Sequence, residues 1–232
     1  MIFLALDTST EACSVALSYN GRVLALDEVC PQQHSKRILP MVQQVLAEAG
    51  VSLNQLNGIV FGRGPGSFTG VRIGVSVAQG LAFGVDVPVY GVSTLAAMAQ
   101  AAAQSKQAKQ VIAAIDARMA EVYLAAYTLD PQGLMQAISH EVAAKPTALP
   151  AAVTALSFNS DVLGVGTGWQ TYATELQAAL PATIAADILY PSAQFMLPFA
   201  NDAWHNGHFV AAEQAEPVYV RDEVTWQKLP GR

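Results

Sequence analysis

The sequence predicts an α/β protein of two similar lobes, and three repeated features support this prediction. A short apolar strand that ends in an acid occurs at residues 2–7 (IFLALD) and again at residues 111–116 (VIAAID). A turn and a second alternating strand follow in each case. Each half also contains a strand that leads into a glycine-rich loop and a helix, at 56–84 and 161–180. Agreement in the acid, the hairpin and the loop favours a duplicated plan over coincidence.

The first half is predicted to open with an antiparallel meander. Its strands fall at residues 2–7, 13–19 and 22–29, and the strand at 13–19 shows alternating side chains. Asn20-Gly21 is a strong turn signal between the last two strands, because both residues tolerate a positive φ.

Helices and buried strands follow this meander. Apolar residues at helical spacing stop at Gly50, a favourable C-cap, and predict a helix from about 34 to 49 despite Pro40. Ser67 can cap a second helix that extends to about residue 84. The remaining elements of this half are strands at 56–62 and 87–92 and a helix at 93–104.

The second half repeats the plan, with Asp116 placed as Asp7 is in the first half. The further elements are a strand at 121–129, a strand followed by a glycine loop within 161–169, and a helix at 171–180. The polar stretch QSKQAKQ separates the halves, so we expect lobes at residues 1–106 and 107–232. The last segment of the second lobe is expected to pack back on the first.

Composition and charge limit the classes of function. Hydrophobic residues make up 52% of the 232 residues, which excludes a disordered chain. The net charge of −6 provides no overall positive field for nucleic acid or an anionic membrane. Gly, Asp, Gln or Pro interrupts each apolar stretch, so no membrane span is expected. Without a signal peptide, Cys13 and Cys30 are expected to stay reduced in the cytoplasm.

The loop GRGPGSFTG, residues 62–70, raises the question of phosphate binding. It does not match a Walker A loop, because no lysine occurs between Lys36 and Lys106. The third glycine of a dinucleotide-binding fingerprint is displaced to Gly70. Two alternatives remain: backbone N–H groups at the helix start hold an anion, or the glycines form a tight turn that directs the helix.

Four segments carry a specific resemblance: ALDTSTEACSVAL, FGRGPGSFTGVRIG, DARMAEVY and EPVYVRDEVTW. They resemble the bacterial TsaB family, formerly YeaZ, over nearly the whole chain. The resemblance implies an α/β, duplicated actin-like (ASKHA, ribonuclease H-like) fold of two lobes. It also implies a role in forming threonylcarbamoyladenosine in tRNA, as a non-catalytic partner of the catalytic subunit TsaD.

The resemblance further implies the remnant of a nucleotide site. Asp7, Thr8 and Ser9 occupy the hairpin that lies against phosphates in actin-like ATPases, and Asp116 is their counterpart in the second lobe. The second hairpin carries arginine and methionine in place of hydroxyl residues, so ATP hydrolysis is not expected. For Asp7, the alternative is an acid that satisfies N–H groups of its own turn. This chain is expected to require no cofactor, and the candidate place for ATP or ADP is the complex.

A metal site is not expected. TsaD-like subunits carry an H-x-x-x-H pair after the strand that follows the glycine-loop helix. This spacing puts both imidazoles on one helix face, where they can bind a metal. Here Thr94 and Met98 stand at the matching positions, and neither replaces a histidine ligand. His205 and His208 are expected at a solvated helix end.

Small residues recur on one face of the second predicted helix. Gly70, Gly74, Ala78 and Ala82 follow one another at intervals of four residues. Each glycine in a helix costs about 1 kcal/mol relative to alanine, so a reason for the stripe is needed. It lets another element approach closely, and the sequence leaves open whether that element is a partner helix or this chain's own sheet.

The resemblance implies a partner surface on helices 34–49 and 67–84. The predicted contacts are the stripe (Gly70, Gly74, Ala78), apolar neighbours (Met41, Val45, Val71) and a polar rim (His34, Arg37). The same surface, left bare, is expected to form a homodimer. A TsaE-like ATPase is a further expected partner, and tRNA is expected to bind only through the complex.

An independent peptidase or ATPase is the competing class of function. The chain has no H-E-x-x-H motif, and the segments around Ser76 and Ser93 lack the last glycine of a G-x-S-x-G elbow. Neither cysteine has a neighbouring histidine in the sequence to activate it. The partner-subunit hypothesis is therefore preferred.

Overall fold

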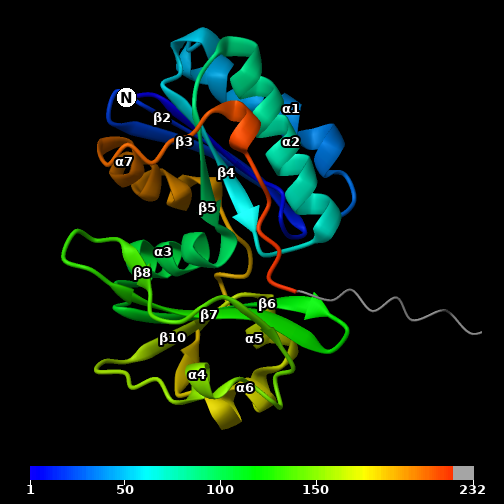
Figure 1. The fold of residues 1–232 in the computed structure, drawn as a ribbon, viewed down its shortest axis with the longest axis vertical. Helices are drawn as coiled ribbons and strands as arrows, with labels where there is room; N and C mark the ends of the chain where they lie inside the picture. Colours follow the sequence, from blue (N-terminus) through cyan, green and yellow to red (C-terminus); the bar gives the residue numbers. More distant parts are fainter. Residues whose placement is uncertain (222–232) are drawn as a thin grey trace, which may run out of the picture.

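The computed structural model describes residues 1–221 and shows two α/β lobes with a helix between them (Figure 1). The first sheet has the strand order β3-β2-β1-β4-β5. Its strands are β1 Phe3–Asp7, β2 Ala12–Tyr19, β3 Arg22–Val29, β4 Gly58–Gly64 and β5 Val89–Ser93. The predicted meander is confirmed, and Asn20 and Gly21 both take a positive φ at its second turn.

The second sheet repeats this topology, with the order β11-β10-β6-β7-β8 and with β9 also paired to β7. In each sheet the strand that carries the acid pairs antiparallel with the next strand and parallel with the strand before the glycine-rich loop. The duplicated plan is therefore confirmed. The strands are β6 Gln110–Arg118, β7 Glu121–Leu129, β8 Met135–Ala137, β9 Val142–Ala144, β10 Val162–Val165 and β11 Ala182–Ile184.

The long helices begin and end close to the predicted residues. Gly50 terminates α1 with φ 65°, and the Ser67 hydroxyl accepts the Gly70 N–H at the start of α2. The α-helices are α1 His34–Ala49, α2 Phe68–Val85, α3 Thr94–Lys106, α4 Ala151–Thr154, α5 Thr167–Thr171, α6 Ala173–Ala179 and α7 Leu197–His205. Short 3₁₀ turns are η1 Leu53–Gln55, η2 Ala193–Met196 and η3 Ala212–Gln214.

The strand and glycine loop predicted within 161–169 are both present. The strand β10 ends at Val165, because Gly166 takes φ 106° and Thr167 begins α5. A β-carbon on Gly166 would overlap the carbonyl of Ala114, so this glycine lets the chain turn against β6. The second glycine loop therefore leads into a short helix, whereas the first leads into α2.

The layers of the molecule follow from which face each strand buries. Leu4 and Leu6 of β1 pack against α1 and α2, whereas Phe3 and Ala5 pack against η2 and α7 on the opposite face. In the second lobe, one face of the sheet packs against α3 and the other packs around Trp169. Figure 1 shows α1 and α2 side by side on one flank of the upper sheet.

Helix α3 contributes to both lobes, although the sequence assigned it to the first. Leu95 and Met98 pack in the core of the second lobe, and Ala97 packs with residues of the first sheet. The residues of η2 and α7 return to the first lobe, where Met196 and Leu197 join its core.

Residues 207–221, which we call the C-terminal strap, run along the first lobe to the second (Figure 1). Val210 pairs with Val89 at the edge of β5, with N···O distances of 2.8 and 2.9 Å. The Gln79 amide donates to the carbonyl of Ala212 at 3.0 Å, and Arg221 reaches β7 of the second lobe. The part of the EPVYVRDEVTW segment from residue 222 onward lies outside the described residues.

Helix α2 meets the length and composition of a membrane span, and it does so alone among the helices of residues 1–221. This result is weak evidence for a span, because 33% of its residues are buried inside the protein and it packs on the first sheet. Its apolar character does, however, extend to its solvent-facing side.

Candidate functional site

The turn after β1 fills the space beside the first glycine-rich loop. The Ser9 carbonyl accepts the Ser67 N–H at 2.7 Å, and the Thr8 hydroxyl donates to the Gly70 carbonyl at 2.7 Å. β-Carbons on Gly66 and Gly70 would overlap the carbonyl oxygens of Ser9 and Thr8. The loop glycines therefore accommodate a turn of the same chain, which takes up an N–H group at the start of α2.

Asp7 is buried beneath this turn. One carboxylate oxygen accepts the Ser9 N–H at 2.9 Å and the Ser9 hydroxyl at 2.8 Å. The other oxygen has no partner among the described residues and lies against Gly62, where a β-carbon would overlap it. Burial raises the pKa of Asp7 from 3.8 to about 6, because an ionised carboxylate loses its hydration there. Asp7 thus supports the turn, as predicted by the alternative in which this acid satisfies an N–H group of its own turn.

A cavity of about 390 Å³ lies between the lobes, beside the turns after β1 and β6. Of the residues predicted for a remnant nucleotide site, Ser9 and Asp116 line this cavity. Its lining residues are Ser9, Thr10, Glu11, Pro31, Gln32, His34, Gly66, Ser67, Phe68, Ile115, Asp116, Ala117, Arg118, Tyr123 and Arg221.

The two arginines of the cavity are already paired with acids. Arg118 contacts Glu11 of the opposite lobe at 2.7 Å, and Arg221 contacts Glu121 at 2.5 Å. An incoming anion would have to compete with these carboxylates.

The turn after β6 is strained. Arg118, Met119 and Ala120 all take a positive φ, between 55° and 63°, which is unfavourable for residues other than glycine. The Arg118 N–H donates to the Asp116 carboxylate at 2.9 Å and helps to hold the turn. The sequence gives no signal for this conformation, because no glycine or asparagine occurs there.

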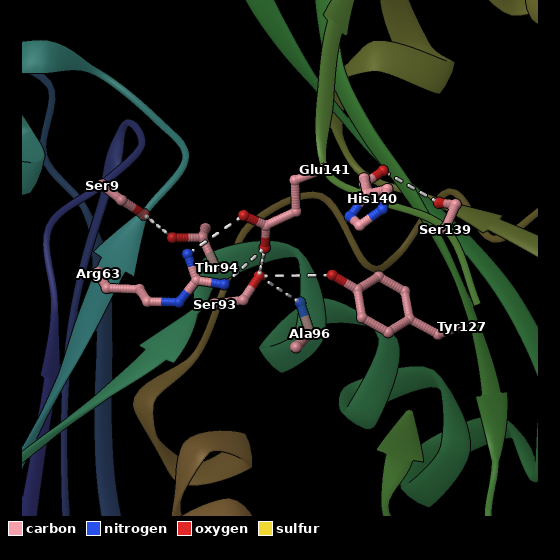
Figure 2. Close-up of polar contacts among 9 residues, drawn as sticks. All are labelled: Ser9, Arg63, Ser93, Thr94, Ala96, Tyr127, Ser139, His140 and Glu141. Atoms are coloured by element: carbon pink, nitrogen blue, oxygen red, sulfur yellow. Dashed lines mark hydrogen bonds and ion pairs between the residues drawn. The ribbon is translucent and has the colours of Figure 1, made fainter. Parts of the chain in front are cut away.

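The positions that correspond to metal-binding histidines are occupied by packed side chains. Thr94 is buried and donates a hydrogen bond to the Ser9 hydroxyl at 3.1 Å (Figure 2). Met98 is buried in the core of the second lobe. Within residues 1–221, no group of three or more His, Cys, Asp or Glu side chains is placed to hold a metal ion.

A polar network joins the lobes next to Thr94. Figure 2 shows Arg63, Ser93 and Glu141 pointing toward one another, with Tyr127 to the right of Ser93. Arg63 donates to both oxygens of Glu141 at 3.1 and 3.2 Å, and the Ser93 hydroxyl donates to Glu141. Ser93 also lies 3.4 Å from the Tyr127 hydroxyl. Burial raises the pKa of Tyr127, so this phenol stays neutral.

This network was missed by sequence reasoning, since Arg63 and Glu141 are 78 positions apart. Ser93 also caps α3 by accepting the Ala96 N–H at 3.2 Å. Its hydroxyl therefore hydrogen-bonds to the Ala96 N–H and to the Glu141 carboxylate, and not to a catalytic base.

The cysteines do not offer a nucleophile. Cys13 and Cys30 are both buried, and burial raises the pKa of Cys13 to about 12 and that of Cys30 in the same direction. A thiol of this kind stays protonated near neutral pH.

The small-residue stripe of α2 faces inward, which corrects its assignment as a partner contact. Gly70, Gly74 and Ala78 are buried, and a β-carbon on Gly74 would lie 2.8 Å from the Thr8 hydroxyl and 3.7 Å from Leu6. Glycine is needed at these positions because β1 and its turn pack closely against this side of α2. This is the alternative in which the stripe meets the chain's own sheet.

The other predicted contact residues need a similar correction. Met41, Val45 and Val71 are each 3% exposed or less and belong to the core of the first lobe. His34 is also buried and lines the interlobe cavity. Arg37 is partly exposed and pairs with Glu28 at 2.6 Å.

A second set of small residues lies on the outward side of α2. Ser76, Gly80 and Gly84 are exposed, and β-carbons on the two glycines would meet nothing within 4 Å. Phe83 beside them is 69% exposed, and Leu39 of α1 is 49% exposed. A shallow cavity of about 390 Å³ adjoins this side and is lined by Ser35, Phe68, Thr69, Arg72, Ile73, Ser76 and Val77. We call these exposed residues of α1 and α2 the outer helix face.

The duplicated sheets, with a cavity between the acid-bearing turns, define a two-lobed protein of the actin-like, ribonuclease H-like class. The family model described as "TsaD: tRNA N6-adenosine threonylcarbamoyltransferase" matches residues 26–228. The tRNA threonylcarbamoyladenosine biosynthesis protein TsaB of Escherichia coli K12 is 48% identical over 232 residues and is covered along its full length, as is this chain.

The protein of the same name from Haemophilus influenzae is 45% identical, with 100% of this chain and 98% of the relative covered. A solved structure, YeaZ from Pseudomonas aeruginosa, is 47% identical, with a TM-score of 0.86 over 94% of this chain and 99% of that one. This chain belongs to the TsaB family of tRNA threonylcarbamoyladenosine biosynthesis proteins.

Proposed function

We propose that this chain is a non-catalytic subunit that binds a TsaD-like catalytic subunit and supports its transfer of threonylcarbamoyl to tRNA. The names of its relatives support a role in threonylcarbamoyladenosine biosynthesis. The observation that carries the binding part of the proposal is the outer helix face, with bare glycines beside exposed apolar side chains.

The glycines of this face have no evident role within the chain. An exposed glycine inside a helix costs about 1 kcal/mol relative to alanine, and alanine would meet no neighbour at Gly80 or Gly84. A partner helix that crosses α2 here would gain close backbone contact. It would also cover Phe83 and Leu39, which are otherwise exposed to water. The cost within the monomer is then offset in the complex.

The interlobe region supports a non-catalytic role. Thr94 and Met98 are packed where metal-binding histidines are expected in the catalytic subunit. The turn of Asp7–Ser9 occupies the space beside the glycine loop, and the arginines of the cavity are paired with acids.

The proposal includes further partners and a location. A TsaE-like ATPase acts with the two subunits, and tRNA binds through the complex because this chain has a net charge of −6. This chain needs no cofactor of its own, and ATP or ADP binds in the complex. Without its partner, a second copy occupies the outer helix face, and the protein works in the cytoplasm.

A reconstituted assay tests the proposal. Purified chain, catalytic subunit, TsaE-like ATPase and threonylcarbamoyl-adenylate are combined with tRNA, and each component is omitted in turn. We expect modified tRNA only when the catalytic subunit and this chain are both present. Turnover by this chain alone, as a peptidase or an ATPase, would support the competing class. Full activity of the catalytic subunit without this chain would contradict the proposal.

A pair of variants tests the surface itself. Gly80→Leu places a bulky side chain where the partner helix is proposed to cross, and we expect at least about tenfold weaker pairing. Gly80→Ala adds one methyl group and serves as the matched control for helix stability. Sedimentation with the catalytic subunit measures pairing, and circular dichroism confirms folding. Equal pairing by folded Gly80→Leu would place the contact elsewhere.

A further inference from the structure

The guanidinium of Arg72 lies on aromatic rings at one end of the outer helix face. Its carbon atom Cζ is 3.5 Å from the centre of the Phe68 ring and 5.3 Å from the centre of the Tyr219 ring. The two rings are 5.7 Å apart. Phe68 and Tyr219 are 55% and 46% exposed, so the cluster stands at the surface. Stacking holds a guanidinium through its flat face and leaves the N–H donors at its edge for another group.

Tyr219 reaches this cluster because the C-terminal strap is fixed on both sides of it. On one side, the Val218 N–H donates to the Arg63 carbonyl at 2.7 Å. On the other side, Arg221 contacts the Ala117 carbonyl at 3.2 Å and the Glu121 carboxylate at 2.5 Å. The ring that restricts Arg72 therefore comes from a segment anchored to both lobes.

Arg72 is the one charged residue in α2, and the other residues of this helix are apolar or neutral. The shallow cavity beside it is lined by hydroxyl and apolar side chains, with no acid among them. Within residues 1–221, Arg72 and Arg22 have no carboxylate within 4.0 Å, whereas Arg37, Arg63, Arg118 and Arg221 each have at least one. A restricted cation at the end of an apolar surface is complementary to an acid on an apolar helix.

We propose that Arg72 is the anion anchor of the outer helix face, and that Tyr219 of the C-terminal strap positions it. Its partner group is a carboxylate on an otherwise apolar helix of the TsaD-like catalytic subunit. A planar guanidinium receives such a carboxylate through two parallel N–H donors, which fixes the register of the helices as well as adding affinity. This inference rests on the proposed pairing of the two subunits.

Binding of the full-length chain to the catalytic subunit is measured by titration at several salt concentrations. We expect Arg72→Gln to weaken binding about tenfold and to reduce the salt dependence. Arg72→Lys keeps the charge but not the fork of donors, and intermediate binding is expected. Lys145→Gln, which removes an exposed cation of the second lobe, is the matched control and should bind as the unaltered chain does.

The role of Tyr219 is tested by its own pair of variants. Tyr219→Phe keeps the ring and should bind normally, whereas Tyr219→Leu should weaken binding and lose part of the salt dependence. Charge reversal gives the most specific readout. Binding lost in Arg72→Glu should be restored when one acidic residue on the docking helices of the catalytic subunit is changed to lysine.

The outcomes separate this inference from the proposed pairing. If the unaltered chain fails to bind the catalytic subunit, the proposed function itself fails. If the unaltered chain binds, and both Arg72→Gln and Arg72→Glu bind as well as it does, the proposed anchor is wrong. Asp222 and Glu223 follow the last residue that the structure describes. If Asp222→Asn with Glu223→Gln reproduces the Arg72→Gln defect, the carboxylate belongs to this chain and the proposed partner group is wrong. A salt-dependent complex with tRNA alone that Arg72→Gln abolishes would assign the anchor to phosphate instead.

Discussion

The hydroxyl of Thr8 donates a hydrogen bond to the carbonyl of Gly70 at 2.7 Å, and this contact ties the first turn of the chain to the inward side of α2. The approach of the two backbones is possible because position 70 has no side chain. Within this chain, the inward side of α2 therefore requires glycine at position 70, whereas its outward side has room for a side chain at Gly80 and Gly84.

Alanine substitutions on the two sides of α2 should change stability in opposite directions. Gly70→Ala is expected to lower the free energy of unfolding by about 2 kcal/mol or more, because its methyl group would overlap the Thr8 carbonyl. Gly80→Ala is expected to raise it by up to about 1 kcal/mol, because the methyl group meets nothing. Chemical denaturation measures both. Equal effects at the two positions would contradict the orientation of α2.

Asp7 should make the stability of the protein depend on pH. Its pKa in the folded protein is about 6, above the ordinary value of 3.8, so the folded state holds the proton more tightly than the unfolded state. The stabilisation is complete below about pH 4, falls as pH rises, and is lost above about pH 6, a difference of about 3 kcal/mol. Asp7→Asn should remove this contribution.

The measurement is the difference in unfolding free energy between pH 4.5 and pH 7.5, for the unaltered chain and for Asp7→Asn. Asp161→Asn, at an exposed carboxylate, is the control for general effects of charge. An unchanged pH dependence in Asp7→Asn would show that the folded protein does not hold this proton.

The contact between Arg63 and Glu141 should stabilise the joined lobes. Both side chains are mostly buried, with 28% and 13% exposed, and Glu141 also accepts from Ser93. A double-mutant cycle of Arg63→Ala and Glu141→Ala is expected to give a coupling energy of about 1 to 2 kcal/mol. The exposed pair Lys106 and Asp187, at 40% and 61%, should give a value near zero. Similar coupling in the two pairs would argue against a special role for the buried contact.

The isolated chain should not form a tight complex with tRNA. Its acids outnumber Lys and Arg by 18 to 12, and the cavity arginines are already paired. A gel-shift titration at moderate salt should show weak binding or none. A tight complex with the chain alone would mean that the local arrangement of arginines outweighs the net charge.

Much of the fold could be predicted from local patterns. Gly50 and Ser67 mark helix ends through their backbone and side-chain preferences, and Asn20-Gly21 sets a hairpin, so short stretches of sequence sufficed. Asp7 could be placed at a strand end, and its burial beneath the turn agrees with the structural alternative for it.

The orientation of α2 could not be predicted in this way. Small residues recur at intervals of four on both sides of the helix, at Gly70 and Gly74 and again at Gly80 and Gly84. Periodicity identifies such stripes but does not show which one faces the sheet. That depends on the turn after β1, whose Thr8 and Ser9 are distant in sequence.

Contacts between segments that are distant in the sequence could not be predicted either. Arg63 meets Glu141, and Tyr219 meets Arg72, only because the lobes and the C-terminal strap come together. The left-handed turn at Met119 is held by its surroundings, since its residue types do not favour it.

The position of α3 between the two sheets has a consequence for motion and for unfolding. Leu95 packs in one core and Ala97 in the other, so a rotation of one lobe against the other would disrupt packing on both sides of a single helix. Hinge closure around a ligand needs a few free residues between rigid bodies, and here the connecting element is itself part of both. Heat should therefore melt the chain in one cooperative step. The molecule is therefore better suited to pack against another subunit as one rigid body than to open and close around a ligand.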